Sequence, residues 1–297
     1  MKRKCPICGN LIDLDYFFCD KCGNRVNDGF EYVEDYPINE TPSPEKKPSI
    51  IKSLLAFLGI YISYSYILPF IITFIYIVLN AISPTSFPDP NIMTDKSYAL
   101  LNIIINLVND VLVIIMLIIL LKLTKRTKEI LGPQRIPTSQ KISTSITNGM
   151  ITFAMMYGAI YILGIFSMLL FPSITEDNAN QELVSSYISD FPFLGFLLVV
   201  VFAPIVEEFV FRFFLCKPLE KSKKWLGVIV SAIIFGGVHL IASIETGTFI
   251  EDLPSLVLYV GMGFVLSYRY ATTDNITSNI LAHSAYNFIS FLTILLL

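Results

Sequence analysis

Histidine and charge are scarce in this sequence: the 297 residues include two histidines, and charged residues make up only 15% of the chain. Hydrophobic residues make up 54%, and the mean hydropathy is +0.65. This balance excludes an ordinary soluble domain and is typical of a protein that crosses a membrane several times. Basic patches with interleaved aromatic residues are also lacking, so we expect no binding to nucleic acid.

The amino-terminal end lacks an apolar segment, since the first apolar run begins only near residue 50, and we therefore expect no cleaved signal peptide. That first run is too short for two spans and a turn, so we predict one tilted helix there, with a kink at Pro69. The predicted fold class is all-α, a polytopic transmembrane helical bundle. About seven runs reach or approach the roughly 20 residues that a spanning helix needs, at 50–80, 98–121, 149–171, 193–216, 225–243, 254–271 and 275–297.

Lysine and arginine are absent from segments 172–192 and 244–253, both of which contain acids. By contrast, segment 122–141 contains six basic residues and segment 217–224 contains four. Basic segments stay on the cytoplasmic side of a membrane, and here they alternate with the acidic segments as seven spans require. The sequence predicts a multi-pass protein of the cell membrane, with the amino terminus in the cytoplasm and the carboxy terminus outside.

Cysteine is also rare, but four of the five cysteines lie in two CxxCG motifs near the amino terminus. Each CxxC turn presents two thiolates on one side, so two turns can complete a tetrahedral zinc site. Disulfides are the alternative, but the topology places this segment in the reducing cytoplasm, which favours zinc. The predicted zinc ligands are Cys5, Cys8, Cys19 and Cys22.

The domain organisation follows from this motif. Residues 1–25 are predicted to form a zinc ribbon that needs its metal to fold, because it is too small for a core of its own. A closed site of four thiolates has no open position for catalysis, so we expect a structural zinc, or a module that binds a protein partner. Residues 26–49 are rich in acids and proline and are predicted to be a disordered linker, which leaves 50–297 as the transmembrane domain.

Ionisable residues inside the apolar runs are few, and they are grouped into motifs. In hydrocarbon such a side chain costs roughly 3 kcal/mol, so a group of them indicates a functional site. The fourth run contains EExxxR, formed by Glu207, Glu208 and Arg212. Arg212 shares a helix face with Glu208 and can pair with it, whereas Glu207, rotated by about 100°, remains free to act. A purely structural ionic cluster is the alternative.

Both histidines of the chain lie in similar motifs. Phe235 and His239 form FxxxH in the fifth run, with two glycines between them that allow a neighbouring helix to approach closely. His283 and Asn287 form HxxxN in the seventh run, and on a helix these two hydrogen-bonding groups lie on one face. Three such motifs on three predicted helices are a far stronger signal than any one of them.

Together the motifs resemble those of the CPBP family of intramembrane proteases, which includes the type II CAAX prenyl proteases and the bacterial Abi proteins. The resemblance covers about residues 193–297 and implies hydrolysis of a peptide bond of a membrane-associated protein or peptide, within the lipid bilayer. It also implies that Glu207 and His239 activate a water molecule and that His283 and Asn287 stabilise the oxyanion. Glu208 and Arg212 match supporting positions.

Three alternatives remain beside this interpretation. Two histidines and one glutamate are also ligands of a catalytic zinc, so His239, His283 and Glu207 would suit a metalloprotease, although the sequence lacks HExxH. We favour the metal-free mechanism. A transporter would also bury such groups, but the chain shows no internal repeats. A catalytically idle scaffold that recruits partners through its zinc ribbon is disfavoured by the complete set of catalytic positions.

Two points of geometry stay open in the sequence. By a rise of about 1.5 Å per residue, Glu207 is expected nearer the cytoplasm than His239, by roughly 10 Å for straight helices. Either the fifth span begins below the membrane, or the glycine pair bends it. Asp110, with Asn102, Asn106 and Asn109, forms a polar stripe in the second span, for which we favour a role in helix packing over a role in lining a substrate site.

Overall fold

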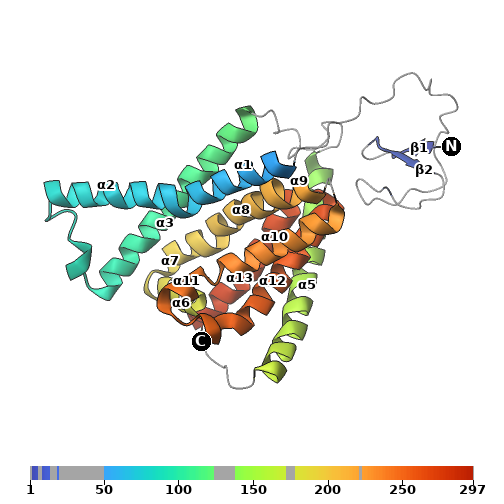
Figure 1. The fold of residues 1–297 in the computed structure, drawn as a ribbon. Coiled ribbons are helices and arrows are strands. Elements are labelled where there is room, and N and C mark those ends of the chain that lie inside the picture. Colours follow the sequence, from blue (N-terminus) through green and yellow to red (C-terminus); the bar gives the residue numbers. More distant parts are fainter. Residues whose placement is uncertain are drawn as a thin grey trace.

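The computed structural model describes residues 2–5, 9–13, 19, 50–123, 138–171, 178–220 and 223–296, and the transmembrane part is helical throughout (Figure 1). Among these residues, seven helical segments are long and apolar enough to cross a membrane, which confirms the predicted multi-span membrane protein. They are Leu54–Ile82, Asp95–Leu123, Lys141–Leu170, Pro192–Glu220, Trp225–Thr246, Phe249–Thr273 and Ile276–Leu296.

The first span is a single long rod, as predicted, and it is irregular just before Pro69 (Figure 1). The α-helices α1 (Ile50–Ile62) and α2 (Leu68–Ile82) are joined by a π-helical turn, η1 (Ser63–Ile67). In η1 the Leu68 N–H donates to the Ser63 carbonyl, five residues back. The next residue is Pro69, which has no N–H for the Tyr64 carbonyl. Asn109 Nδ2 donates to that carbonyl instead, at 3.2 Å.

Asn109 belongs to α3 (Asp95–Leu123), the second span. Its hydrogen bond to the first span agrees with the packing role expected for the polar stripe. Asn106 instead donates to the Asn102 carbonyl of its own helix, at 2.9 Å. The third span lies in α5 (Thr138–Leu170), and a 3₁₀ turn, η2 (Pro90–Ile92), connects the first two spans.

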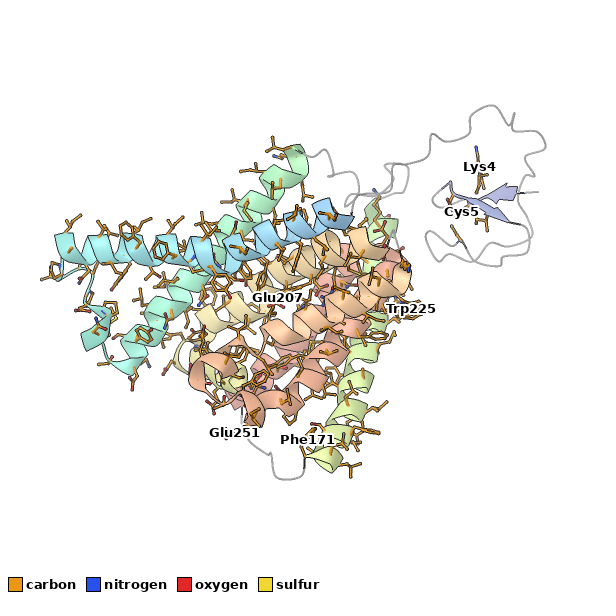
Figure 2. All side chains as sticks on the ribbon, in the orientation of Figure 1. Lys4, Cys5, Phe171, Glu207, Trp225 and Glu251 are labelled. Atoms are coloured by element: carbon orange, nitrogen blue, oxygen red, sulfur yellow. The ribbon has the colours of Figure 1, made fainter. Side chains whose placement is uncertain are left out.

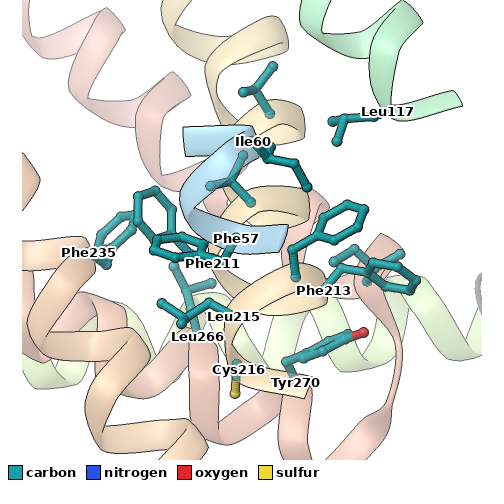
Figure 3. Packing of buried hydrophobic residues seen from close by; sticks show 14 of the residues in the cluster. Phe57, Ile60, Leu117, Phe211, Phe213, Leu215, Cys216, Phe235, Leu266 and Tyr270 are labelled. Carbon is teal, nitrogen blue, oxygen red and sulfur yellow. The ribbon is translucent and has the colours of Figure 1, made fainter. Parts of the chain in front are cut away.

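The fourth span is the central helix of the bundle. It comprises α7 (Pro192–Gly195), η3 (Phe196–Phe202), α8 (Ala203–Glu207), η4 (Glu208–Cys216) and α9 (Lys217–Glu220), of which η3 and η4 are π-helical. Of the nine residues in η4, all but Phe209 are buried. A helix that is apolar all round belongs inside a protein, and η4 supplies much of the core that contacts α1 and the later helices (Figure 3).

The last three spans complete the bundle as α10 (Lys224–Val238) with α11 (Ile241–Thr246), α12 (Phe249–Thr273) and α13 (Ile276–Leu296). A short helix, α6 (Ala179–Asp190), precedes the fourth span. As expected from the FxxxH motif, glycine allows α10 and α12 to pack closely. A Cβ on Gly236 would lie 2.8 Å from the backbone nitrogen of Val260, whereas Gly237 faces open space.

The described part of the amino-terminal segment is a pair of antiparallel strands, β1 (Lys2–Lys4) and β2 (Leu11–Asp13), in which Lys4 is opposite Leu11. Cys5 is buried at the end of β1, and Gly9 has a left-handed φ of +72°, as a tight turn requires. Cys19 is also buried. Cys8, Cys22 and the predicted linker 26–49 lie outside the described residues, so the zinc ribbon stays a prediction.

The orientation in the membrane is tested by labelling with an impermeant thiol reagent. We expect a cysteine at Glu182, in the acidic segment, to react on intact cells, and a cysteine at Lys223 to react only after permeabilisation. Both side chains are exposed in the structure, so a lack of labelling cannot come from burial. The parent protein controls for its own cysteines. The opposite pattern of labelling would refute the predicted orientation.

Candidate active site

The acid pair lies where α8 meets η4, in the middle of the fourth span. Glu207 is the last residue of α8 and its side chain is 18% exposed, whereas Glu208 begins η4 and is completely buried. Glu207 lines a cavity of about 250 Å³ in the interior of the bundle (Figure 2). Two adjacent carboxylates thus have opposite environments, one facing open space and the other enclosed by protein.

Glu208 is held by three partners. Its Oε2 lies 3.2 Å from Arg212 Nε and accepts a hydrogen bond from Asn279 Nδ2 at 3.1 Å. Its Oε1 lies 3.0 Å from His283 Nδ1. The ion pair with Arg212 was expected from the EExxxR spacing. The links to His283 and Asn279 were not, and they show that Glu208 also orients the histidine of the seventh span.

Arg212 is itself fully enclosed. Its guanidinium lies over the ring of Phe235 at 4.5 Å and its Nη1 lies 3.4 Å from Ser231 Oγ. A buried cation on an aromatic face gains from the negative potential of the ring. The phenylalanine of the FxxxH motif therefore contacts the arginine of the EExxxR motif, which joins the fourth and fifth spans.

His283 lies between the two acids. Because an ionised carboxylate can only accept, the contact with Glu208 requires that Nδ1 of His283 carries a hydrogen. The opposite nitrogen, Nε2, lies 3.8 Å from Oε2 of Glu207. The imidazole is therefore held at one nitrogen and presents the other nitrogen to the carboxylate that faces the cavity.

His239 lies on the wall of the same cavity as Glu207. Its Nδ1 is 2.7 Å from the Phe235 carbonyl, which can only accept, so Nδ1 carries a hydrogen and Nε2 remains available. The ring stacks on Tyr259, with centroids 4.5 Å apart and an angle of 22°. Both rings nitrogens of the FxxxH histidine thus have defined roles before any substrate binds.

The expected separation of about 10 Å in depth between Glu207 and His239 does not hold. Glu207 lies 13 residues before the end of its span at Glu220, and His239 lies 14 residues after the start of its span at Trp225, so both reach the same depth. In addition, α10 ends at Val238, directly after the glycine pair, and the chain turns before α11. The glycine pair is therefore where the fifth span is interrupted.

Asn287 Nδ2 donates to the Val199 carbonyl in η3 at 2.9 Å. Within η3 the Ala203 N–H donates to the Leu198 carbonyl, five residues back, so the following Pro204 would leave the Val199 carbonyl without a donor. Asn287 supplies that donor. An amide has two hydrogens, so the second hydrogen of Asn287 is not used by this bond.

Several residues of the site were missed in the sequence. Asn279 lies four residues before His283, so the spacing NxxxHxxxN was a signal that could have found it. Tyr259 and Tyr64 had no such signal, because tyrosines are common in this chain. Asp110 is buried and interacts electrostatically with Glu207, and among the described residues it has no hydrogen bond or ion pair.

The residues were also tested for a metal site. Within the described ranges, no three His, Cys, Asp or Glu side chains converge on one point as ligands of a metal ion do. One imidazole nitrogen of each histidine is already engaged, with Glu208 or with the Phe235 carbonyl. The donor set does not fit a bound metal in this arrangement, so no step below is derived through one.

Comparison with known proteins places the site within a recognised family segment. Residues 189–289 match the family model described as "Type II CAAX prenyl endopeptidase Rce1-like". This segment contains all six candidate residues of the three motifs, and the match supports the resemblance found in the sequence.

Two curated proteins are similar over the same part of the chain. The chain is 31% identical over 115 residues to a Bacillus subtilis protein named "Putative membrane peptidase YdiL". It is 29% identical over 115 residues to "UPF0177 protein YbdI" of Lactococcus lactis. The alignments cover 38% and 39% of this chain, and 42% and 56% of those proteins, about half of their length. No solved structure matches this chain.

Proposed function

We propose that this protein is an intramembrane endopeptidase that hydrolyses a peptide bond of a membrane-associated protein or peptide. The observation that carries the proposal is the pair of adjacent carboxylates in opposite environments. Glu207 faces a cavity that His239 also lines, while Glu208 is buried with Arg212 and orients His283. The match to a family of prenyl endopeptidases over this segment, and the similarity to a protein named as a membrane peptidase, support the same chemistry.

Glu207 acts in this proposal as the general base. A water molecule between its carboxylate and Nε2 of His239 attacks the carbonyl carbon of the substrate, and the water proton passes to Glu207. The C–N bond then breaks, and the same proton passes to the leaving nitrogen. General-base assistance of this kind contributes roughly 10²- to 10⁴-fold to a rate.

His283 and Asn287 stabilise the negative oxygen of the tetrahedral intermediate in this proposal. Because Nδ1 of His283 is engaged with Glu208, only Nε2 can reach the cavity side, where Glu207 lies 3.8 Å away. The second amide hydrogen of Asn287 is the other donor. A donor fixed in a water-poor site contributes about 3–4 kcal/mol to such stabilisation.

The experiment that tests this function is a substrate screen. Purified protein in lipid vesicles is incubated with a library of membrane-associated peptides, and the products are identified by mass spectrometry. The Glu207→Ala variant, prepared in parallel, removes the proposed base and controls for contaminating proteases. Cleavage by the wild type alone supports the function, and equal cleavage by both proteins contradicts it.

We also propose that residues 1–25 hold one structural zinc and that the membrane site holds none. Elemental analysis of the full-length protein should then give about one zinc per chain, since four thiolates form one closed site. A protein that lacks residues 1–49, or that carries serine at all four predicted ligands, should contain none and still cleave. If one zinc remained in the truncated protein and were lost together with activity on chelation, the metalloprotease alternative would be correct.

A further inference from the structure

The ring of His239 is fixed on two faces and at one nitrogen. The Phe235 carbonyl engages Nδ1 at 2.7 Å, and the ring of Phe235 lies 4.7 Å from the imidazole at an angle of 51°. Tyr259 of α12 covers the imidazole in a nearly parallel stack at 4.5 Å. His239 follows the end of α10, where the helix no longer restrains it, so these contacts are what set the direction of Nε2.

Tyr259 reaches this position because α10 and α12 approach closely beside it. The neighbouring residue, Val260, lies against Gly236, where a Cβ would be only 2.8 Å from the Val260 backbone nitrogen. One turn further along α12, Gly263 contacts Ala232 in the same way, with its ideal Cβ 3.1 Å from the Ala232 Cα. The two glycines bring the α12 backbone close enough for Tyr259 to lie on the imidazole.

The hydroxyl of Tyr259 is held in turn by the start of α6. Asn180 Nδ2 donates to this hydroxyl at 3.1 Å, and the hydroxyl donates to Asn178 Oδ1 at 3.4 Å. Asn178 is the N-cap of α6, and its Oδ1 also accepts from the Gln181 N–H. Asn180 lines the cavity that contains Glu207 and His239. Tyr259 therefore connects the wall of the cavity to the histidine across the ring.

We propose that Tyr259 is a positioning residue that aims Nε2 of His239 into the cavity beside Glu207, and that Asn178 and Asn180 hold Tyr259 in place. This inference rests on the proposed function for its effect on the rate, but the arrangement can be tested without any substrate. The stack fixes the plane of the imidazole, and the hydroxyl pair fixes the tyrosine, so removing the ring should matter more than removing the hydroxyl.

The first test uses the fact that His239 and His283 are the only histidines of the chain. Protein labelled with ¹⁵N-histidine gives the signals of two imidazoles, which a His239→Gln variant assigns. Tyr259→Leu should shift or broaden the His239 signals and leave those of His283 unchanged, and Tyr259→Phe should have a smaller effect. Tyr161→Leu, at a tyrosine that is 72% exposed, is the matched control and should leave both sets unchanged.

The second test is kinetic. Tyr259→Leu should lower kcat by about 10- to 100-fold with little change in KM, because misplacement of a catalytic group by about 1 Å costs up to that much. Tyr259→Phe and Asn180→Ala should lie between this variant and the wild type. Unchanged His239 signals in folded Tyr259→Leu would overturn the proposal, and so would a wild-type kcat in that variant. If the wild type cleaved no substrate, the proposed function would fail while the spectra still decided the positioning role.

Discussion

We expect Glu207→Gln to lower the rate of peptide cleavage by about 10²- to 10⁴-fold, because an amide cannot accept the proton of the attacking water. The substitution keeps the shape of the side chain, and Glu207 makes no ion pair with Arg212, whose partner is Glu208. The variant should therefore insert and fold as the wild type does. The measurement is a cleavage assay in vesicles, together with thermal unfolding to confirm the fold.

A matched control for this variant is Glu245→Gln. Glu245 also lines the cavity but lies in α11, beyond His239, and has no role in the proposed chemistry. It should retain most of the activity. Turnover by Glu207→Gln close to the wild-type rate would end the assignment of Glu207 as the base, whatever the behaviour of the control.

Glu208→Gln should have the opposite effect and lower the stability of the fold. Glu208 and Arg212 are both 0% exposed, so the substitution leaves a buried guanidinium without its carboxylate. Removing one partner of a buried ion pair typically costs about 3–5 kcal/mol. The measurement is the free energy of unfolding in detergent micelles, with Glu251→Gln, at an exposed acid, as the control.

The double variant Glu208→Gln/Arg212→Met separates the pair from the fold. Replacing both partners removes the uncompensated charge, so this variant should regain much of the lost stability. It should remain inactive, since His283 loses the carboxylate that orients its ring. A single variant Glu208→Gln as stable as the wild type would contradict the structural role given to the pair.

The number of spans and the pairing of Glu208 with Arg212 could be predicted because each depends on residues near one another in the chain. Apolar length alone fixes a spanning helix, and a spacing of four residues fixes a shared face. The link from His283 to Glu208 depends on how α13 packs on η4, which no local pattern encodes. The stack of Tyr259 on His239 likewise depends on the approach of α12 to α10.

The depth of the site was predicted wrongly for a related reason. A constant rise per residue ignores where each span starts, and the count for Glu207 and His239 changes once both spans are measured from Glu220 and Trp225. The interruption after the glycine pair was one of the two expected possibilities. Whether the predicted catalytic roles and the zinc ribbon hold is decided by the experiments above.

The prolines of the first and fourth spans have a consequence for the way these helices are wound. Each π-helical turn, at η1, η3 and η4, ends one residue before a proline, at Pro69, Pro204 and Pro218. Such a turn holds about one residue more than an α-helical turn, so it offsets the helix by about 100°. The face that carries Glu207 is thus out of phase with the face that precedes η3, and an asparagine on another helix, Asn109 or Asn287, locks two of these phase steps in place.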